Sequence, residues 1–355
     1  MRPDGKRAKI SRRVRLKDIA ERCGVSTATV SRALSSRGYV EGALAQRIRD
    51  EAVRLNYPLP SSQAGRRVLL VASGAAMLDF ARSQFTLHVL DGIRERCAVL
   101  GMQVETRQAD GLTDEVAALT EAETDPGVAG VLMLTIDAPE MLERARRCGR
   151  PVVLVNGDDP DMGLSSVAPC NRSAAALATR HLRAGGHRRI LFLTCPGRRT
   201  IARRQDGFRD AMGDDFDPAM VANVSDWRPD VAADAVAARL TQEPDITAIL
   251  ASGDALAMGA YQGLARLGLR VPLDVSVLSI DGLPQGELLD PPLSAVAIPM
   301  RAVGAAALDL LCDHVSNPLA TVRRIELACR LMDRGSTAAA KAGNGGAADT
   351  KGAAR

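Results

Sequence analysis

The chain has 355 residues, 46% of them apolar, and its 46 Lys and Arg against 42 Asp and Glu give a formal net charge of +4. At about 150 residues per domain, this length predicts two or three domains. No apolar run approaches the roughly 20 residues of a membrane-spanning helix, and the basic N-terminus lacks the apolar stretch of a secretory signal. The seven cysteines are scattered, without a Cys-x-x-Cys motif, so we expect reduced thiols in a cytoplasmic protein rather than a disulfide framework or zinc site.

The charge is distributed unevenly along the chain. Residues 1–67 carry 16 Lys and Arg against six Asp and Glu, a net charge of +10, whereas the remaining residues carry a net charge of −6. A basic head on an acidic body indicates an anionic partner for the head alone, either nucleic acid or a membrane surface. A solvated basic arm at residues 1–13 is the simpler interpretation unless a folded DNA-reading element follows it.

Three short helices are predicted after this arm. Apolar residues at 16, 19, 20 and 23 repeat with the spacing of one helix face, and Gly24 ends that helix. Ser26 is placed as the N-cap of a second helix, residues 27–34, and a third helix is expected at 43–55. Two short helices joined by a tight turn are typical of a helix-turn-helix. The expected shared core is apolar throughout: Leu16, Ile19, Ala20, Val25, Val30, Leu34, Leu44, Ile48 and Leu55.

The second of these helices is the expected recognition helix, which would enter the major groove of double-stranded DNA. Thr27, Ala28 and Arg32 are the candidate base-reading residues, because an Arg guanidinium matches guanine and small methyl groups fit thymine. For Arg32, a solvated helix face is the alternative interpretation. The polar residues expected to bind phosphates, together with the basic arm, are Ser26, Thr29 and Ser35.

The run LKDIAERCGVSTATVSRALSSRGYV closely resembles the DNA-binding head of the lactose-repressor (LacI/GalR) family. The family's pattern of Asp, Ala, Gly-Val-Ser and Thr-Val-Ser-Arg is present without gaps from Asp18 to Arg32. The resemblance implies that residues 14–57 form a helix-turn-helix domain. It also implies that Thr27, Ala28 and Arg32 read the bases of an operator.

A joint at residues 58–67 follows the helix-turn-helix. The family usually continues with a hinge helix whose Leu inserts into the minor groove. This sequence has two prolines and no equivalent Leu, so we expect a short, stiff linker without such a wedge. Arg66 and Arg67 would either contact phosphate or remain solvated.

From residue 68 onward the sequence alternates between apolar runs and helical segments, which predicts a doubly wound α/β body. The expected buried parallel strands are 68–72, 128–134, 151–155, 189–193, 246–252 and 275–280. The helices expected between them include 86–100, 172–184, 230–241 and 254–267. These strands are too many for one small sheet, so we predict two similar lobes with a ligand cleft at the strand ends.

Nucleotide-binding glycine loops, a nucleophile elbow and a metal-ligand cluster are missing from the body, so we predict no catalytic residue, cofactor or metal. The family resemblance extends to about residue 337 and implies a homodimer with a periplasmic-binding-protein-like core. It implies a first lobe at about 68–168 and 299–327 and a second at about 169–298 and 328–337. Residues 338–355 are expected to form a disordered tail.

Seven positions match the ligand cleft of the family and are candidate effector-binding residues: Phe85, Thr86, Asn156, Arg204, Trp227, Asp281 and Met300. Arg198, on the loop before the helix that carries Arg204, is the eighth candidate. Arg204 and Asp281 suit the vicinal hydroxyls of a sugar, although Arg204 could instead pair with Asp206 on the surface. Trp227, the only Trp, could line the cleft or belong to the core. Asp254 is expected to be a helix N-cap.

These features lead to the hypothesis of a DNA-binding transcriptional regulator, most simply a repressor of carbohydrate-metabolism genes. A dimer would bind a pseudo-palindromic operator, and a sugar, sugar acid or polyol in the cleft would change the spacing of its two heads. Control by a protein partner or a non-sugar ligand is the alternative within regulation. A sugar-binding protein or an enzyme without a DNA-binding role is disfavoured by the helix-turn-helix and by the missing catalytic constellation.

Overall fold

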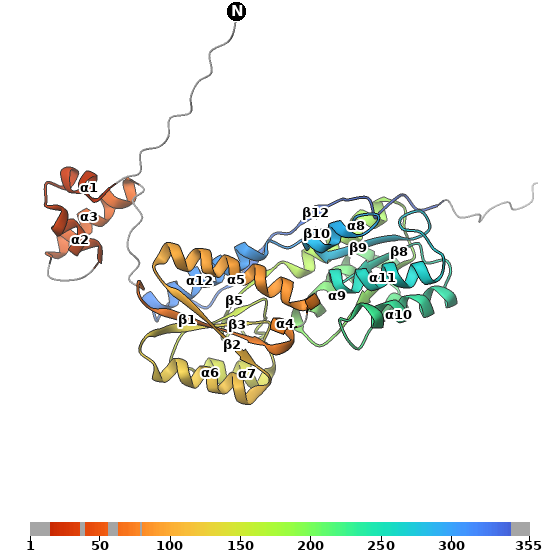
Figure 1. Cartoon of the computed structure of the whole chain (residues 1–355), viewed down its shortest axis with the longest axis horizontal. Helices are drawn as coiled ribbons and strands as arrows, with labels where there is room; N and C mark the ends of the chain where they lie inside the picture. The colour runs from red at the N-terminus through yellow and green to blue at the C-terminus, as the bar shows by residue number, and fades with distance from the viewer. Residues whose placement is uncertain (1–14, 36–39, 56–62, 79, 342–355) are drawn as a thin grey trace, which may run out of the picture. The chain divides into compact units, whose positions relative to one another are not determined.

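The computed structural model describes residues 15–35, 40–55, 63–78 and 80–341 (Figure 1). The chain divides into two compact units, one made of residues 1–66 and 97–103 and the other of residues 67–96 and 104–355. Every helix in the described ranges is too short or too polar to span a bilayer. The basic arm and the first part of the joint lie outside the described residues.

The head consists of three helices: α1 (Leu16–Cys23), α2 (Thr27–Ser35) and α3 (Gly42–Arg54). These bounds confirm the predicted helices to within one residue at each end. The shared core consists of small and medium apolar side chains: Ile19, Ala20, Cys23, Val30, Ala33, Leu34, Ala45, Ile48 and Ala52. The larger predicted core residues at its margin are partly buried: Leu16, Val25, Leu44 and Leu55.

The turn between α1 and α2 is fixed by local chemistry. Gly24 has a φ of 66°, a left-handed conformation that residues with a Cβ adopt only with strain. Arg47 of α3 donates to the Cys23 carbonyl oxygen at 2.8 Å and so satisfies the end of α1. Ser26 Oγ accepts from the Thr29 backbone N–H at 3.0 Å, which confirms Ser26 as the N-cap of α2.

The first lobe of the body is a six-stranded sheet with helices on both faces (Figure 1). Its strand order is β11-β5-β4-β3-β1-β2. The strands are β1 (Arg67–Ser73), β2 (Gln103–Ala109), β3 (Val128–Leu134), β4 (Val152–Val155), β5 (Ser165–Pro169) and β11 (Arg324–Leu327). The helices are α4 (Gly74–Leu78), α5 (Phe80–Leu100), α6 (Leu112–Thr124), α7 (Pro139–Arg146) and α12 (Met300–Ser316). Helices α5 and α12 cover one face, and α6 and α7 cover the other (Figure 1).

The second lobe repeats this architecture with the strand order β12-β10-β9-β8-β6-β7. Its strands are β6 (Ile190–Thr194), β7 (Val221–Asn223), β8 (Ala248–Ala251), β9 (Ser276–Asp281), β10 (Ser294–Ala297) and β12 (Arg330–Met332). Its helices are α8 (Asn171–Ala184), α9 (Arg199–Met212), α10 (Pro229–Gln242) and α11 (Asp254–Arg266). Helix α8 packs on α9, and α10 packs on α11. Short 3-10 turns lie at Gly213–Asp215, Pro218–Met220 and Pro284–Leu288.

The chain passes between the two sheets after β5, after β10 and after β11. The prediction of an α/β body with two sheets is therefore confirmed. The strands found from sequence are long apolar runs such as β3, all of whose residues are buried, because parallel strands covered on both faces exclude polar side chains. The strands not predicted from the sequence include polar edge strands such as β2 and β11, whose residues are mostly half-exposed.

A close helix crossing in the first lobe depends on glycine. A Cβ on Gly304 of α12 would lie 2.1 Å from the Val89 carbonyl oxygen of α5. We expect Gly304→Ala to lower the free energy of unfolding by about 1–3 kcal/mol, because an overpacked contact forces backbone shifts. Urea denaturation measures this loss. An equal loss for Gly149→Ala, whose Cβ would meet only the Glu123 side chain at 4.0 Å, would contradict the steric explanation.

Two predictions at the ends of the body need correction. Arg67 belongs to β1 and pairs with Asp125 and, at 3.3 Å, with Glu105, so its role is within the first lobe and not in a solvated linker. Disorder from residue 338 onward is wrong for the first four residues, because the Ala338 N–H donates to Ser276 Oγ at 3.0 Å and Lys341 pairs with an Asp at 2.6 Å. Residues 342–355 lie outside the described residues.

Candidate functional site

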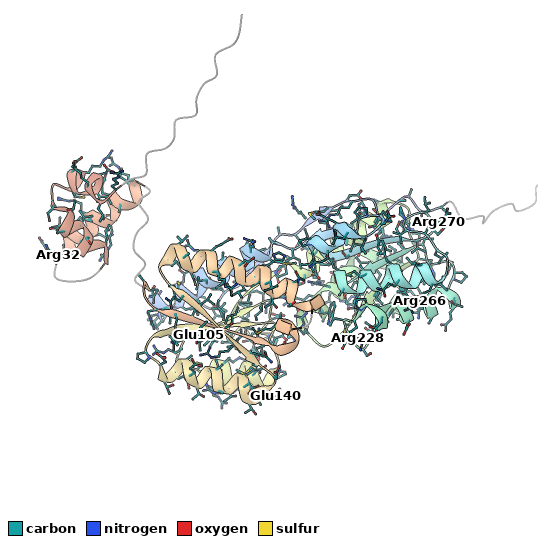
Figure 2. The ribbon with its side chains drawn as sticks, viewed as in Figure 1. Arg32, Glu105, Glu140, Arg228, Arg266 and Arg270 are labelled. Carbon is teal, nitrogen blue, oxygen red and sulfur yellow. The ribbon has the colours of Figure 1, made fainter. Side chains whose placement is uncertain are left out.

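The outer face of α2 carries the predicted base-reading residues. Thr27, Ala28 and Arg32 are exposed, and Figure 2 shows Arg32 at the surface of the head. Arg32 Nε donates to the Ala28 carbonyl oxygen at 3.3 Å, a long contact that leaves the guanidinium in solvent. Both interpretations of Arg32 require a solvated side chain in the absence of DNA, and the exposed position leaves the guanidinium available to read bases.

Two of the hydroxyl groups predicted to bind phosphate also form hydrogen bonds at the start of α2. Ser26 Oγ and Thr29 Oγ1 lie 2.9 Å apart within hydrogen-bond distance, and Ser26 also caps α2. These bonds fix the first turn of the helix, whose N-terminus attracts phosphate through its unsatisfied backbone N–H groups. The side chain of Ser35 lies outside the described residues.

A cavity of about 350 Å³ opens between the two lobes, at the carboxyl ends of their strands. The first lobe lines it with Ser73, Ala76, Phe85, Thr86, Thr135 and Asn156. The second lobe lines it with Cys195, Pro196, Arg198, Arg204, Ser225, Asp226, Trp227, Ala255, Asp281 and Leu283. Its position agrees with the rule that open α/β sheets bind ligands beyond the carboxyl ends of their strands.

Seven of the eight candidate effector residues line this cavity, and Met300 does not. Met300 is buried at the start of α12 and borders a separate depression beside His88. Several lining residues that were not predicted lie at the ends of strands or directly after them: Ser73 ends β1, Thr135 follows β3 and Cys195 follows β6. The strand-end rule could have found them.

Arg204 and Asp281 form the charged pair on the second-lobe wall of the cavity. Arg204 Nη1 lies 3.2 Å from Asp281 Oδ1, and its Nε donates to Asn171 Oδ1 at 2.8 Å. The Nη1 group also donates to the Ser252 carbonyl oxygen. Arg204 is only 4% exposed, so its guanidinium is oriented before any ligand binds. The alternative pairing with Asp206 does not occur, because Asp206 pairs with Arg209 at 2.8 Å.

The pKa of the Asp281 carboxyl group is raised, which favours its protonated, neutral form. Burial raises the pKa of Asp281 to about 6, the positive charge of Arg204 opposes this rise, and the charge of Asp254 adds to it. Asp281 also has a positive φ of 148°, a backbone conformation that non-glycine residues rarely adopt. The carboxylate is thus a charged acceptor above about pH 6 and a hydrogen-bond donor below it.

Asp254 is a buried structural bridge, and its predicted role as a helix N-cap is wrong. The N-cap of α11 is Gly253. The Asp254 carboxylate instead accepts from Ser279 Oγ at 2.5 Å and from the Leu283 backbone N–H at 2.6 Å. It therefore ties α11 to β9, which ends at Asp281, and to the segment that follows this strand.

Both lobes direct unsatisfied polar atoms toward the cavity. Thr86 Oγ1, Asn156 Oδ1 and Arg198 Nη1 are buried and have no hydrogen-bond partner among the described residues, although such atoms are normally paired. Asn156 and its neighbour Thr135 have φ values of 50° and 57°, and strained backbone of this kind concentrates at functional sites. The wall therefore offers hydrogen-bond donors and acceptors that a polar ligand would satisfy.

Arg198 is the second guanidinium of the cavity. Burial lowers the pKa of Arg198, the nearby charge of Arg204 lowers it further, and the carboxyl group of Asp137 opposes the shift. Burial in turn raises the pKa of Asp137, a first-lobe residue, and the charge of Arg198 opposes that shift. A cation of the second lobe and an acid of the first lobe thus act on each other across the cleft.

Trp227 both lines the cavity and packs on the core of the second lobe. It is therefore a cleft residue and a core residue at once. Its ring occupies space that a side chain at position 253 would need: a Cβ on Gly253 would lie 2.7 Å from Trp227 Cζ3 and 3.2 Å from Asp281 Oδ2. The φ of Gly253 is −171°, which any residue adopts. The ring, and not the backbone, therefore requires glycine there.

We expect Gly253→Ala to displace the Trp227 ring. The added methyl group cannot share the space of Cζ3, and a shift of the ring costs less than a shift of the α11 backbone. Trp227 is the only Trp in the chain, so intrinsic fluorescence reports this site alone, and its emission maximum should move by several nanometres. An unchanged emission spectrum would show that a group other than the Trp227 ring moves to accommodate the methyl group. Gly149→Ala is the matched control.

Two family models match separate parts of the chain, one in the basic head and one in the acidic body. Residues 15–58 match the family described as "Bacterial regulatory proteins, lacI family". Residues 179–337 match the family described as "Periplasmic binding protein-like domain". Together these matches cover more than half of the chain and include both the recognition helix and the second-lobe wall of the cavity.

Individual relatives align over nearly the whole length. The regulator "HTH-type transcriptional regulator MalR" of Streptomyces coelicolor is 31% identical over 337 residues, covering 92% of this chain and 97% of that protein. The "Ribose operon repressor" of Escherichia coli is 28% identical over 330 residues, covering 90% and 99%. A solved "transcriptional regulator CelR-cellobiose complex" superposes with a TM-score of 0.70 at 26% identity, covering 91% of this chain and 100% of that one. The chain therefore belongs to the lacI family of bacterial regulatory proteins and is a DNA-binding transcriptional regulator.

Proposed function

We propose that this regulator is a cytoplasmic repressor of carbohydrate-metabolism genes whose effector is a small sugar bound in the interlobe cavity. The observation that carries the proposal is the set of unsatisfied polar atoms that both lobes direct into the cavity, Thr86 Oγ1, Asn156 Oδ1 and Arg198 Nη1. A sugar hydroxyl both donates and accepts, so one polyhydroxylated ligand satisfies such a mixed set.

The remaining features of the cavity support the same ligand class. Asp281 offers carboxylate acceptors and Arg204 a guanidinium donor group on the same wall of the cavity, and the Trp227 ring provides a flat apolar surface for the C–H face of a sugar ring. The volume of about 350 Å³ suits a ligand of mono- or disaccharide size. One relative is named as a ribose operon repressor and another was solved in complex with cellobiose, which agrees with this class.

We further propose that the chain acts on DNA as a homodimer. One recognition helix offers only Thr27, Ala28 and Arg32 for reading bases, which is too few contacts for a unique site. Two heads related by a two-fold axis would double the contacts and match a pseudo-palindromic operator. Effector binding would then change the affinity for that operator through a coupling free energy of about 1–3 kcal/mol.

Titration of Trp227 fluorescence with D-ribose, maltose, cellobiose, D-gluconate and D-sorbitol tests the effector class. The proposal predicts a saturable change with at least one of these sugars, sugar acids or polyols. A response to none of them would favour control by a non-sugar ligand or a protein partner. Asp210→Asn, which removes a carboxylate from the outer surface of α9 where it pairs with Arg172, is the matched control and should bind as the unchanged protein does.

A further inference from the structure

A buried acid beside the effector cavity is surrounded by three arginines. Asp158 follows the cavity residue Asn156 by two positions, and its side chain is only 4% exposed. Arg203 Nε donates to Asp158 Oδ2 at 2.8 Å, and Arg199 Nε lies 3.5 Å from the same oxygen. Arg324 pairs with the other carboxylate oxygen. This cluster lies outside the set of residues that line the cavity.

The ion pairs of Asp158 cross from one lobe to the other. Asp158 lies between β4 and β5 of the first sheet, and Arg324 is the first residue of β11 in that sheet. Arg199 and Arg203 belong to α9, which follows β6 of the second sheet and packs on α8. Arg324 therefore supports the acid from within its own lobe, whereas Arg199 and Arg203 bind it from the opposite lobe.

The segment that carries Asp158 is held rigidly. The next residue, Asp159, is buried, and its carboxylate accepts from the Gly163 and Leu164 backbone N–H groups, each at 2.9 Å. Arg146 donates to the same carboxylate at 3.2 Å. Asp158 is thus presented toward α9 by a fixed scaffold, unlike an acid on a flexible surface loop.

The same helix turn joins this cluster to the cavity. Arg203 binds Asp158, while the adjacent Arg204 lines the cavity and contacts Asp281 at 3.2 Å. A movement that draws α9 away from the first lobe would widen the cavity and break both cross-lobe ion pairs together. Exposed ion pairs contribute little to stability, but removing the partners of a buried charge is costly, and Asp158 is buried.

We propose that Asp158, Arg199 and Arg203 form an ionic clasp that holds the two lobes closed without effector. The clasp sets the population of the closed state, which is the state that binds effector. When this population decreases, the apparent affinity for effector decreases by the same factor. The regulatory meaning of closure rests on the proposed function, whereas the clasp itself acts whether or not a sugar is the effector.

Acrylamide quenching of Trp227 in the full-length chain tests the clasp without any ligand. Trp227 lines the cavity and is the only Trp, so opening of the lobes exposes it to the quencher. We expect Arg203→Gln and Asp158→Asn each to raise the quenching constant at least about twofold, with Arg203→Lys much closer to the unchanged protein. The matched control is Arg144→Gln, because Arg144 is 26% exposed and pairs with Glu123 at 2.9 Å within the first lobe.

Two comparisons make the result decisive. The double variant should show no larger change than Asp158→Asn alone, because both substitutions remove the same interaction. Circular dichroism separates opening from unfolding: quenching that rises while the helical signal stays constant supports the clasp. Unchanged quenching in both single variants, or a rise only where helical signal is lost, overturns it.

Sugar titration separates failure of the clasp from failure of the proposed function. For any sugar of the panel that binds the unchanged protein, we expect about tenfold weaker binding to Arg203→Gln and recovery of normal quenching at saturation. If none of these sugars binds, the proposed effector class is wrong while the quenching result still decides the clasp. If a sugar binds both proteins equally and quenching is unchanged, the clasp is overturned and the proposed function remains.

Discussion

Arg32→Ala should weaken binding to the specific operator by at least about thirtyfold. Each arginine–guanine contact contributes about 1–3 kcal/mol of discrimination, and a dimer loses two such contacts, so the expected loss is about 2–6 kcal/mol. Arg32 is exposed, with only a 3.3 Å contact to Ala28, so its removal should leave the head folded. Fluorescence anisotropy with an operator selected from a random duplex library measures the loss.

The specificity of this effect distinguishes base reading from general charge attraction. Arg54→Ala removes the same charge from α3, where Arg54 is 72% exposed and lies 3.7 Å from Glu51. We expect this control to weaken binding slightly and equally for all sequences, because a phosphate-type contribution carries no base preference. If Arg32→Ala weakens operator and scrambled duplexes by the same factor, Arg32 does not read bases.

Asp281→Asn should abolish the response to effector while leaving operator binding without effector intact. The substitution keeps the size of the side chain but removes the charged acceptor opposite Arg204 Nη1, 3.2 Å away. We expect at least about a hundredfold loss of sugar affinity, since a charge-assisted hydrogen bond is lost and Arg204 remains buried without its counter-ion. Trp227 fluorescence measures sugar binding, and anisotropy measures operator binding.

The pH dependence of sugar binding gives an independent check on Asp281. Burial raises the pKa of this carboxyl to about 6, so the ionised acceptor is lost as pH falls through 6. Sugar affinity should therefore rise between pH 5 and pH 7 and level off above it. Asp281→Asn should remove this dependence, whereas Asp210→Asn should preserve it. If operator binding fails in Asp281→Asn without effector, Asp281 is structural.

The head could be predicted almost completely from the sequence, because local rules determine it. The apolar spacing of α1, the break at Gly24 and the Ser26 cap each act within a few residues, and the structure places all three as expected. The position of Arg32 follows from the helix alone. The phosphate contacts do not, since they depend on a bound duplex.

In the body, the strands could be predicted where complete burial requires an apolar sequence. Features that depend on contacts between residues far apart in the chain could not be predicted. Strands such as β3 are apolar throughout, whereas the edge strand β11 is polar and short. The role of Asp254 was missed because a helix-start Asp normally caps its own helix; here Ser279 and Leu283, more than 20 residues further along the chain, bind its carboxylate. The same limit hid the Asp158 cluster, whose partners are 41 to 166 positions away.

Met300 shows a different limit of family resemblance. The resemblance placed it in the cleft, but as the first residue of α12 it is buried beside Pro299 and borders another depression. Most of the residues that do line the cavity lie at strand ends or shortly after them, whereas Phe85 and Thr86 lie within α5. Position relative to the strand ends was therefore a better guide than alignment for this residue.

The most direct test of the account is an anisotropy titration of the selected inverted-repeat duplex with and without a saturating panel sugar. We predict that the sugar changes operator affinity by about 5- to 150-fold, the range of a typical allosteric coupling, and that Asp281→Asn eliminates the change. A selection that enriches no sequence would contradict DNA-binding regulation by this chain. Sugars that alter Trp227 fluorescence but leave the affinity for the operator unchanged would contradict effector control.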